Sequence, residues 1–168
     1  IETTIVGEYL LAGENYESLE KARNAGSGNC ILYLGNISEA KGVWEVLEAY
    51  QILCGQNGLQ NLKCVMAGAG RELEALKSAA SAKDIQIEFP GYVQNELKKG
   101  VFKNAHLYVF PSAHEGMPTS VLEAMAFGLP VITTRVGGLS DFFENGKMGL
   151  FLDSRDPDHI AEKTGYLL

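Results

Sequence analysis

The sequence predicts an α/β domain of three layers, in which a parallel sheet of about six strands lies between two layers of helices. Two observations lead to this prediction. Short apolar runs of strand length alternate with segments of helical apolar spacing, and the connections between them are short. Several of these runs are continuous rather than alternating in polarity, which is typical of parallel strands buried on both faces.

The individual elements follow from this pattern. The expected strands are residues 30–34, 62–67, 85–89, 106–110, 131–133 and 149–152. The expected helices are residues 43–54, 73–80, 96–104, 121–127 and a last helix from 157 onward. Asp156 should cap that last helix, because Pro157 suits a first helical position, where its missing N–H is not needed.

The first 29 residues have a weaker pattern than the rest of the chain. Residues 1–29 are interpreted as a linker or entry segment, with a short strand in 1–11 and a short helix in 14–24. Residues 30–168 would then form the domain, which is long enough to bury a sizeable core. Because the chain begins with Ile1 and ends inside an expected helix, we expect it to be a fragment of a longer protein.

Composition excludes several classes of protein. The net charge of −7 at pH 7 is opposite to the basic footprint of a nucleic-acid-binding domain. No apolar run is long enough to span a membrane, and no signal-peptide layout is present. Cys30, Cys54 and Cys64 lack metal-ligand spacing, so we expect buried free thiols in a reducing compartment.

Two glycine-containing loops match nucleotide-binding motifs only in part. Gly68-Ala69-Gly70-Arg71-Glu72-Leu73 has two glycines of a dinucleotide fingerprint, but Leu73 stands where the third is required, so we interpret it as a tight strand-to-helix turn. The loop 35–42 lacks the Gly-Lys-Ser/Thr order of an ATPase loop. Lys41 nevertheless lies at an expected helix start, where it is either a phosphate partner or a solvated lysine.

Residues 111–138 are the stretch best suited to bind a ligand. A strand leads into a loop rich in Gly, Pro, Ser and Thr, and a short helix follows, so backbone N–H groups at the helix start form an anion site. The carboxyl ends of parallel strands are where ligands bind in such sheets. Glu115 and Glu123 bracket the loop-to-helix joint. Ser120 and Glu123 also fit a capping box, which leaves Glu115 as the better candidate for ligand contact.

These residues carry a resemblance to a known family. The spacing Glu115-x7-Glu123, within Phe-Pro-Ser-x-x-Glu-Gly-x-Pro-x-x-x-Leu-Glu-Ala-Met-Ala-x-Gly-x-Pro-Val-Ile, resembles the retaining glycosyltransferases of family 4. Further matches fall in family order and cover about residues 30–160. The resemblance implies a Rossmann-like domain, the donor-binding C-terminal half of the two-domain GT-B architecture. It also implies that the N-terminal acceptor domain lies outside this chain.

The resemblance also implies a role for each matched residue. Glu115 would contact the transferred sugar and, with Lys41, act in catalysis. Glu123 would bind the ribose, while Tyr92 and Val93 would face the base. The sugar pocket would be shaped by Gly116, Met117 and Pro118. The diphosphate would be held by Lys41 and by the backbone N–H groups of Thr119, Ser120 and Val121. Stabilising the leaving group in this way replaces a metal, so no metal and no other cofactor is expected.

The implied function is donor binding in an enzyme that transfers a sugar from a nucleotide-diphosphate sugar to an acceptor glycan or lipid-linked saccharide, with retention of configuration. We expect the chain alone to bind a nucleoside diphosphate weakly and to turn nothing over. Nucleic acid is not an expected partner. A cytoplasmic location is expected, and peripheral membrane contact would involve the other domain.

Two alternatives remain at this point. One is a nucleotide-sugar epimerase of the same GT-B fold, against which the Glu115-x7-Glu123 spacing argues. The other is a non-catalytic, donor-like module. Asn36 favours that second alternative, because the family commonly has Arg at this position and one of two cations on the diphosphate would be absent.

Overall fold

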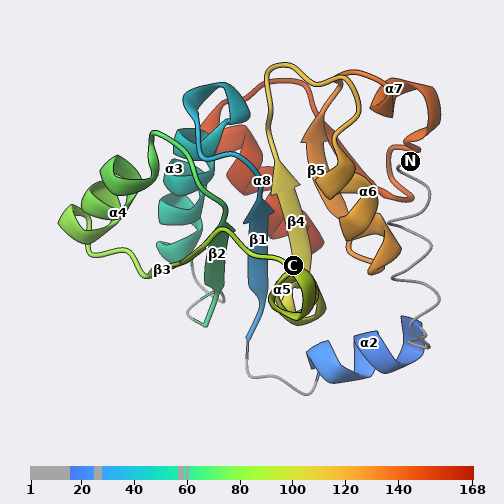
Figure 1. The fold of residues 1–168 in the computed structure, drawn as a ribbon, viewed down its shortest axis with the longest axis horizontal. Helices are drawn as coiled ribbons and strands as arrows, with labels where there is room; N and C mark the ends of the chain where they lie inside the picture. The colour runs from blue at the N-terminus through green and yellow to red at the C-terminus, as the bar shows by residue number, and fades with distance from the viewer. Residues whose placement is uncertain (1–15, 25–27, 57–58, 60) are drawn as a thin grey trace.

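The structure is a computed structural model, and it describes residues 16–24, 28–56, 59 and 61–168 (Figure 1). The strands are β1 (Cys30–Leu34), β2 (Lys63–Ala67), β3 (Ile87–Gly91), β4 (Leu107–Phe110), β5 (Val131–Thr134) and β6 (Gly149–Leu152). The helices are α2 (Tyr16–Asn24), η1 (Glu39–Lys41), α3 (Val43–Cys54), α4 (Leu73–Ala82), α5 (Asn95–Asn104), α6 (Thr119–Ala126), α7 (Leu139–Phe142) and α8 (Pro157–Leu167).

All six strands form one parallel sheet in the order β3-β2-β1-β4-β5-β6. The register at the centre pairs Ile31 with Leu107 and Leu32 with Tyr108. This is the strand order of a doubly wound Rossmann-like fold, whose switch point lies between β1 and β4. The expected fold class, with its sheet of about six parallel strands, is confirmed.

Helices cover both faces of the sheet. On one face α3 packs against α8, and Figure 1 shows α8 behind β4 while α5 lies in front of it. On the face of α5, the rings of Phe102 and Phe127 stack with centroids 5.3 Å apart, which joins α5 to the end of α6. Because α5 and α6 flank β4 in the chain and both return against the strand direction, their N-termini lie at the carboxyl edge of the sheet.

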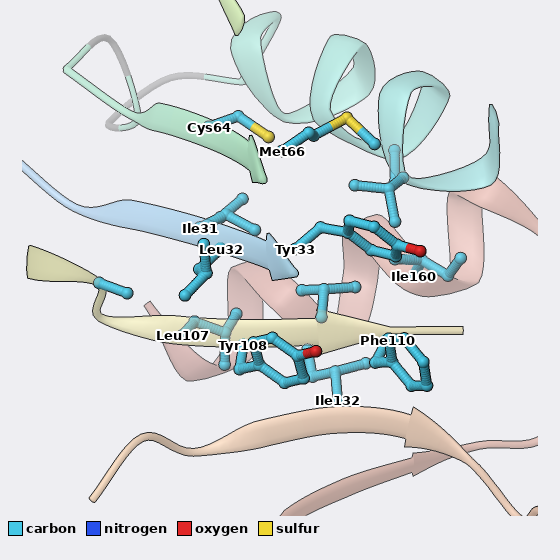
Figure 2. Close-up of a cluster of buried hydrophobic side chains, with 14 of the residues drawn as sticks. Ile31, Leu32, Tyr33, Cys64, Met66, Leu107, Tyr108, Phe110, Ile132 and Ile160 are labelled. Carbon is cyan, nitrogen blue, oxygen red and sulfur yellow. The ribbon is translucent and has the colours of Figure 1, made fainter. Parts of the chain in front are cut away.

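The core is centred on β1 and β4, whose aromatic side chains extend to the switch point (Figure 2). Tyr33 stacks on Phe110 at 5.8 Å, and Tyr108 stacks on Phe110 at 6.1 Å. The Tyr33 hydroxyl donates to the Asn36 carbonyl and the Tyr108 hydroxyl donates to the Leu34 carbonyl, both at 2.7 Å. Burial raises the pKa of both phenols, so they remain donors that fix the loop after β1.

Several expected boundaries differ from the structure by one or two residues. The third strand starts two residues later than expected, because the Ile85 N–H donates to Ala80 at 2.9 Å and Asp84 takes a positive φ of 54°, so both residues close α4. Helix α6 begins at Thr119 rather than at residue 121. The short helix α7 was not expected. The N-cap at Asp156 is confirmed, since its side chain accepts from the Asp158 N–H at 2.9 Å.

The N-terminal segment agrees in part with the expectation. Helix α2 lies within the expected range 14–24 and packs against α5, with Leu19 buried in the core. The strand expected in residues 1–11 lies outside the described residues. Cys30 and Cys64 are buried free thiols, as expected, and burial raises the pKa of the Cys30 thiol to about 11. Cys54 is exposed near the end of α3, so that expectation was wrong for this thiol.

Candidate functional site

A cavity of about 640 Å³ opens at the carboxyl edge, beside the switch point. The turns after β1, β2 and β3 contribute to it, as expected for loops that follow parallel strands. Its lining is Leu34, Gly35, Asn36, Gly68, Ala69, Tyr92, Val93, Gln94, Asn95, Lys98 and Glu123. The Gly68 turn is therefore part of the candidate site, although its motif is not a dinucleotide fingerprint.

Glu123 is the acidic residue of this cavity. Its side chain is only 2% exposed, and its Oε1 lies 2.6 Å from the Lys98 Nζ. Its Oε2 is buried and has no hydrogen-bond partner. A buried carboxylate oxygen without a donor carries a desolvation cost, so the free Oε2 is an acceptor suited to a hydroxyl or N–H group of a ligand.

The capping box that was the alternative interpretation of Ser120 and Glu123 is absent from the described helix α6. The N-cap of α6 is Pro118, and no side chain caps the helix. Ser120 therefore lies inside the first turn, and Glu123 is directed to Lys98 of α5 instead of to a backbone amide of its own helix. The competing structural interpretation of Glu123 is removed, and both carboxylates remain candidates for ligand contact.

Glu115 forms a second pair with a lysine. The Lys41 Nζ lies 2.6 Å from the Glu115 Oε1 and 3.5 Å from the His114 carbonyl. This pair is more open than the Lys98–Glu123 pair, because the side chains of Lys41 and Glu115 are 26% and 13% exposed. Neither residue lines the cavity around Glu123, so the two pairs occupy separate parts of the same edge.

Backbone contacts between loops hold the Lys41–Glu115 pair in place. The Ala113 N–H donates to the Ala40 carbonyl at 2.9 Å, which joins η1 to the loop after β4. The Gly138 N–H donates to the Gly116 carbonyl at 2.8 Å. Gly137 takes a φ of 52°, and a Cβ there would lie 2.0 Å from the Gly116 carbonyl oxygen. Only glycine fits at this close approach.

The start of α6 supplies backbone donors between the two pairs. The N–H groups of Thr119 and Ser120 have no acceptor among the described residues, whereas the Val121 N–H donates to the Pro118 carbonyl at 3.1 Å. Two free amides at the N-terminus of an eight-residue helix favour a negatively charged group. Of the three amides expected to face a diphosphate, Val121 thus already has a partner in this structure.

Tyr92 and Val93 lie on the far side of the cavity from β4. Val93 is buried, whereas the Tyr92 side chain is 72% exposed. Asn36 is also exposed and lines the same cavity. The structure therefore brings Tyr92, Val93 and Glu123 together around one space. Gly116, Met117 and Pro118 lie outside its lining, and Gly116 and Met117 lie near Gly137 and Gly138.

Lys98 is the site residue that sequence reasoning missed. Its position could have indicated this role, because Lys98 lies four residues before Phe102, on the side of the helix that faces the sheet and α6. A lysine on that side is unusual unless it has a buried partner. Within the described residues, no group of three or more His, Cys, Asp or Glu side chains could hold a metal ion.

The family described as "Glycosyl transferases group 1" matches residues 15–168 of this chain. The chain therefore belongs to this glycosyltransferase family. None of the helices in the described residues is both long and apolar enough to cross a membrane.

Curated relatives agree with this assignment. The chain is 33% identical over 143 residues to a D-inositol 3-phosphate glycosyltransferase of Corynebacterium jeikeium, covering 81% of this chain and 34% of the relative. It is 37% identical over 112 residues to the putative teichuronic acid biosynthesis glycosyltransferase TuaC of Bacillus subtilis, covering 67% of this chain and 26% of the relative. The chain thus spans about a third of the length of the curated relatives that it matches.

Solved structures show the same fold at low sequence identity. Anabaena HepE in complex with UDP and glucose has a TM-score of 0.74 at 16% identity, covering 91% of this chain and 43% of that one. The C-terminal domain of the group 1 glycosyl transferase LpcC from Francisella tularensis has a TM-score of 0.73 at 22% identity, covering 92% of this chain and 83% of that one. The fold is the Rossmann-like domain of the GT-B architecture.

Proposed function

We propose that this chain is the donor-binding domain of a retaining glycosyltransferase and binds the nucleoside diphosphate of a nucleotide sugar at the carboxyl edge of its sheet. One observation supports this most. Two Lys–Glu pairs, Lys41–Glu115 and Lys98–Glu123, flank the free amides at the start of α6, and one pair borders a cavity. Along the carboxyl edge of the sheet, carboxylates that can accept hydrogen bonds from sugar hydroxyls thus alternate with lysines and backbone amides that can donate to phosphate.

The proposed placement of the nucleotide follows from this arrangement. The base lies in the cavity against Tyr92 and Val93, and a ribose hydroxyl donates to the free Oε2 of Glu123. The diphosphate lies over the amides of Thr119 and Ser120, where the helix dipole favours negative charge. Its charge draws the ammonium of Lys41 away from Glu115, which leaves the Glu115 carboxylate to accept hydroxyls of the transferred sugar beside Gly116, Met117 and Pro118.

In the reaction, the bond between the anomeric carbon and the diphosphate oxygen breaks with its electron pair on the departing phosphate. The acceptor oxygen bonds to the same carbon, and its proton passes to the departing phosphate oxygen. Lys41 and the start of α6 stabilise the negative charge that develops on the leaving group. Such electrostatic stabilisation is the largest contribution to rate acceleration in many enzymes. We propose that neither a metal nor a cofactor is required. The acceptor, a glycan or a lipid-linked saccharide, would be bound by another part of a cytoplasmic, full-length protein.

The test is titration of the 168-residue chain with UDP, GDP and ADP by calorimetry and by NMR. At least one should bind weakly, with a Kd on the order of 10⁻⁴ to 10⁻³ M, and shift the amide signals of residues 115–123. Absence of any shift in this segment with all three nucleotides would overturn the proposal.

Asn36 allows a second test of the same proposal. Replacing it by Arg adds a cation at the rim of the cavity, and a charge-assisted bond to the diphosphate should strengthen binding about five- to tenfold. Asn36→Gln is the control, because it adds length without charge and should leave the Kd within twofold. Equal affinities of Asn36→Arg and the unmodified chain would favour the non-catalytic, donor-like alternative.

A further inference from the structure

The contact between Lys98 and Glu123 leaves the carboxylate with one oxygen engaged and one free. The Lys98 Nζ is 2.6 Å from the Oε1, while the buried Oε2 has no partner, and both residues line the 640 Å³ cavity. The Lys98 side chain is 24% exposed and the Glu123 side chain 2%. Lys98 therefore holds one oxygen of a carboxylate whose other oxygen is buried and has no hydrogen-bond partner.

The packing of α5 against α6 fixes this contact. Phe102 and Phe127 lie four residues beyond Lys98 and Glu123, so each aromatic ring shares a helix face with one member of the pair. Their rings stack at 5.3 Å with planes 9° apart. The stack sets the distance and register of the two helices, and the charged pair lies one turn nearer the carboxyl edge.

The contact with Lys98 determines how the Glu123 carboxylate can bind a ligand. A carboxylate with so little exposure is stable in its charged form only when a cation or several donors face it. A carboxylate only accepts hydrogen bonds, which suits the hydroxyls of a ribose. If Lys98 is removed, Glu123 loses the contact that holds its Oε1, and the orientation of the carboxylate changes.

We propose that Lys98 is a positioning residue that holds the Oε1 of Glu123 and directs its Oε2 to a hydroxyl of the bound ribose, so that Lys98 determines the selectivity for ribonucleotides. This inference rests on the proposed function, because it specifies the ligand group at one end of the same site. Lys98 acts through Glu123 and does not itself contact the transferred sugar.

The experiment compares UDP, GDP and ADP with their 2′,3′-dideoxy counterparts, using whichever base binds the chain. The unmodified chain should bind the ribonucleotide at least about tenfold more tightly, since a hydrogen bond to a charged group is lost with the hydroxyls. Lys98→Met should weaken ribonucleotide binding about tenfold and leave dideoxynucleotide binding within twofold, so the selectivity disappears. Lys98→Arg should restore most of the selectivity.

Two further variants separate positioning from general effects. Lys99→Met removes the same charge from the adjacent residue, whose partner is the exposed Glu96 at 2.8 Å, and should leave both affinities unchanged. Glu123→Gln should abolish selectivity as Lys98→Met does, and the double variant should lose no more than either alone. Circular dichroism melts check that each variant is folded. If Lys98→Met does not fold, Lys98→Gln and Glu123→Gln supply the same comparison.

The outcomes distinguish this inference from the proposed function. Retained selectivity in Lys98→Met, equal weakening of both nucleotides, or an equal effect of Lys99→Met would overturn the role of Lys98 while donor binding stands. Failure of the unmodified chain to bind any of the three ribonucleotides would overturn the proposed function and this inference together.

Discussion

The Lys41–Glu115 and Lys98–Glu123 pairs have the same 2.6 Å contact but are held in place in different ways. Lys41 is the last residue of η1 after β1, and Glu115 lies in the loop after β4. Backbone hydrogen bonds and a glycine with positive φ hold them. Lys98 and Glu123 lie on helices, and the stacked rings of α5 and α6 hold them. One pair thus depends on close approach of backbones and the other on side-chain packing.

This difference has consequences for how each pair responds to change. A loop held by backbone bonds tolerates side-chain substitutions but not an added Cβ at a close approach. A helix pair held by packing tolerates substitutions that keep the buried side chains, but it does not tolerate substitutions that remove buried side-chain volume. The two carboxylates also differ in exposure, since the Glu115 side chain is 13% exposed and the Glu123 side chain is 2% exposed. The two parts of the site can therefore be disturbed separately.

The largest effect is expected from Phe102→Ala, which removes the ring that stacks on Phe127. Loss of a fully buried phenylalanine side chain should lower the free energy of unfolding by about 3–5 kcal/mol, as measured in urea. Phe102→Leu, which keeps most of the volume, should lose less than half as much. If Phe102→Ala loses no more than Phe102→Leu, the aromatic stack is not what holds the helix-based pair.

Gly137→Ala should disturb the loop-based pair. Its added Cβ would lie 2.0 Å from the Gly116 carbonyl oxygen at a φ of 52°, and such strain should cost roughly 3 kcal/mol of unfolding free energy. The matched control is Gly146→Ala, which has a φ of 85° but no atom within 4 Å of the added Cβ. It should cost only about 1 kcal/mol. Equal losses in the two variants would show that backbone crowding does not maintain this loop.

The fold could be predicted from the sequence further than the site. Continuous apolar runs indicated several of the six strands, because strands buried on both faces admit few polar residues. The third strand was found instead from the alternating residues 85–89. The pairing of Glu123 could not be predicted, since Ser120 offered a plausible local partner and Lys98 lies 25 residues away on another helix. Helix α7 was missed because four residues are too few to show a helical period.

The lysines allow a direct comparison of the two pairs. Lys98→Met leaves the buried Glu123 without its cation and should lower the unfolding free energy by about 2 kcal/mol in urea titrations. Lys41→Met leaves Glu115 more open to water and should lower it by less than about 1 kcal/mol. A larger loss for Lys41→Met would reverse the order that burial predicts.

The smallest effect on stability is expected at Tyr92, whose side chain is 72% exposed at the cavity. Tyr92→Ala should change the unfolding free energy by less than about 0.5 kcal/mol, because few contacts are lost. If a base stacks on the ring, nucleotide affinity should fall about fivefold or more in calorimetry. Tyr166→Ala, at another exposed tyrosine, should change neither quantity. Unchanged affinity in Tyr92→Ala would place the base elsewhere in the cavity.

The hydrogen bond from the Ala113 N–H to the Ala40 carbonyl also has a consequence for dynamics. At 2.9 Å it ties the turn after β1 to the loop after β4, and Gly42 packs so closely beside it that a Cβ there would lie 2.4 Å from the Pro111 carbonyl oxygen. The two loops should therefore open together as one cooperative unit. The amide of Ala113 should exchange its proton with solvent only when that unit opens, and its protection should report when Lys41 and Glu115 separate.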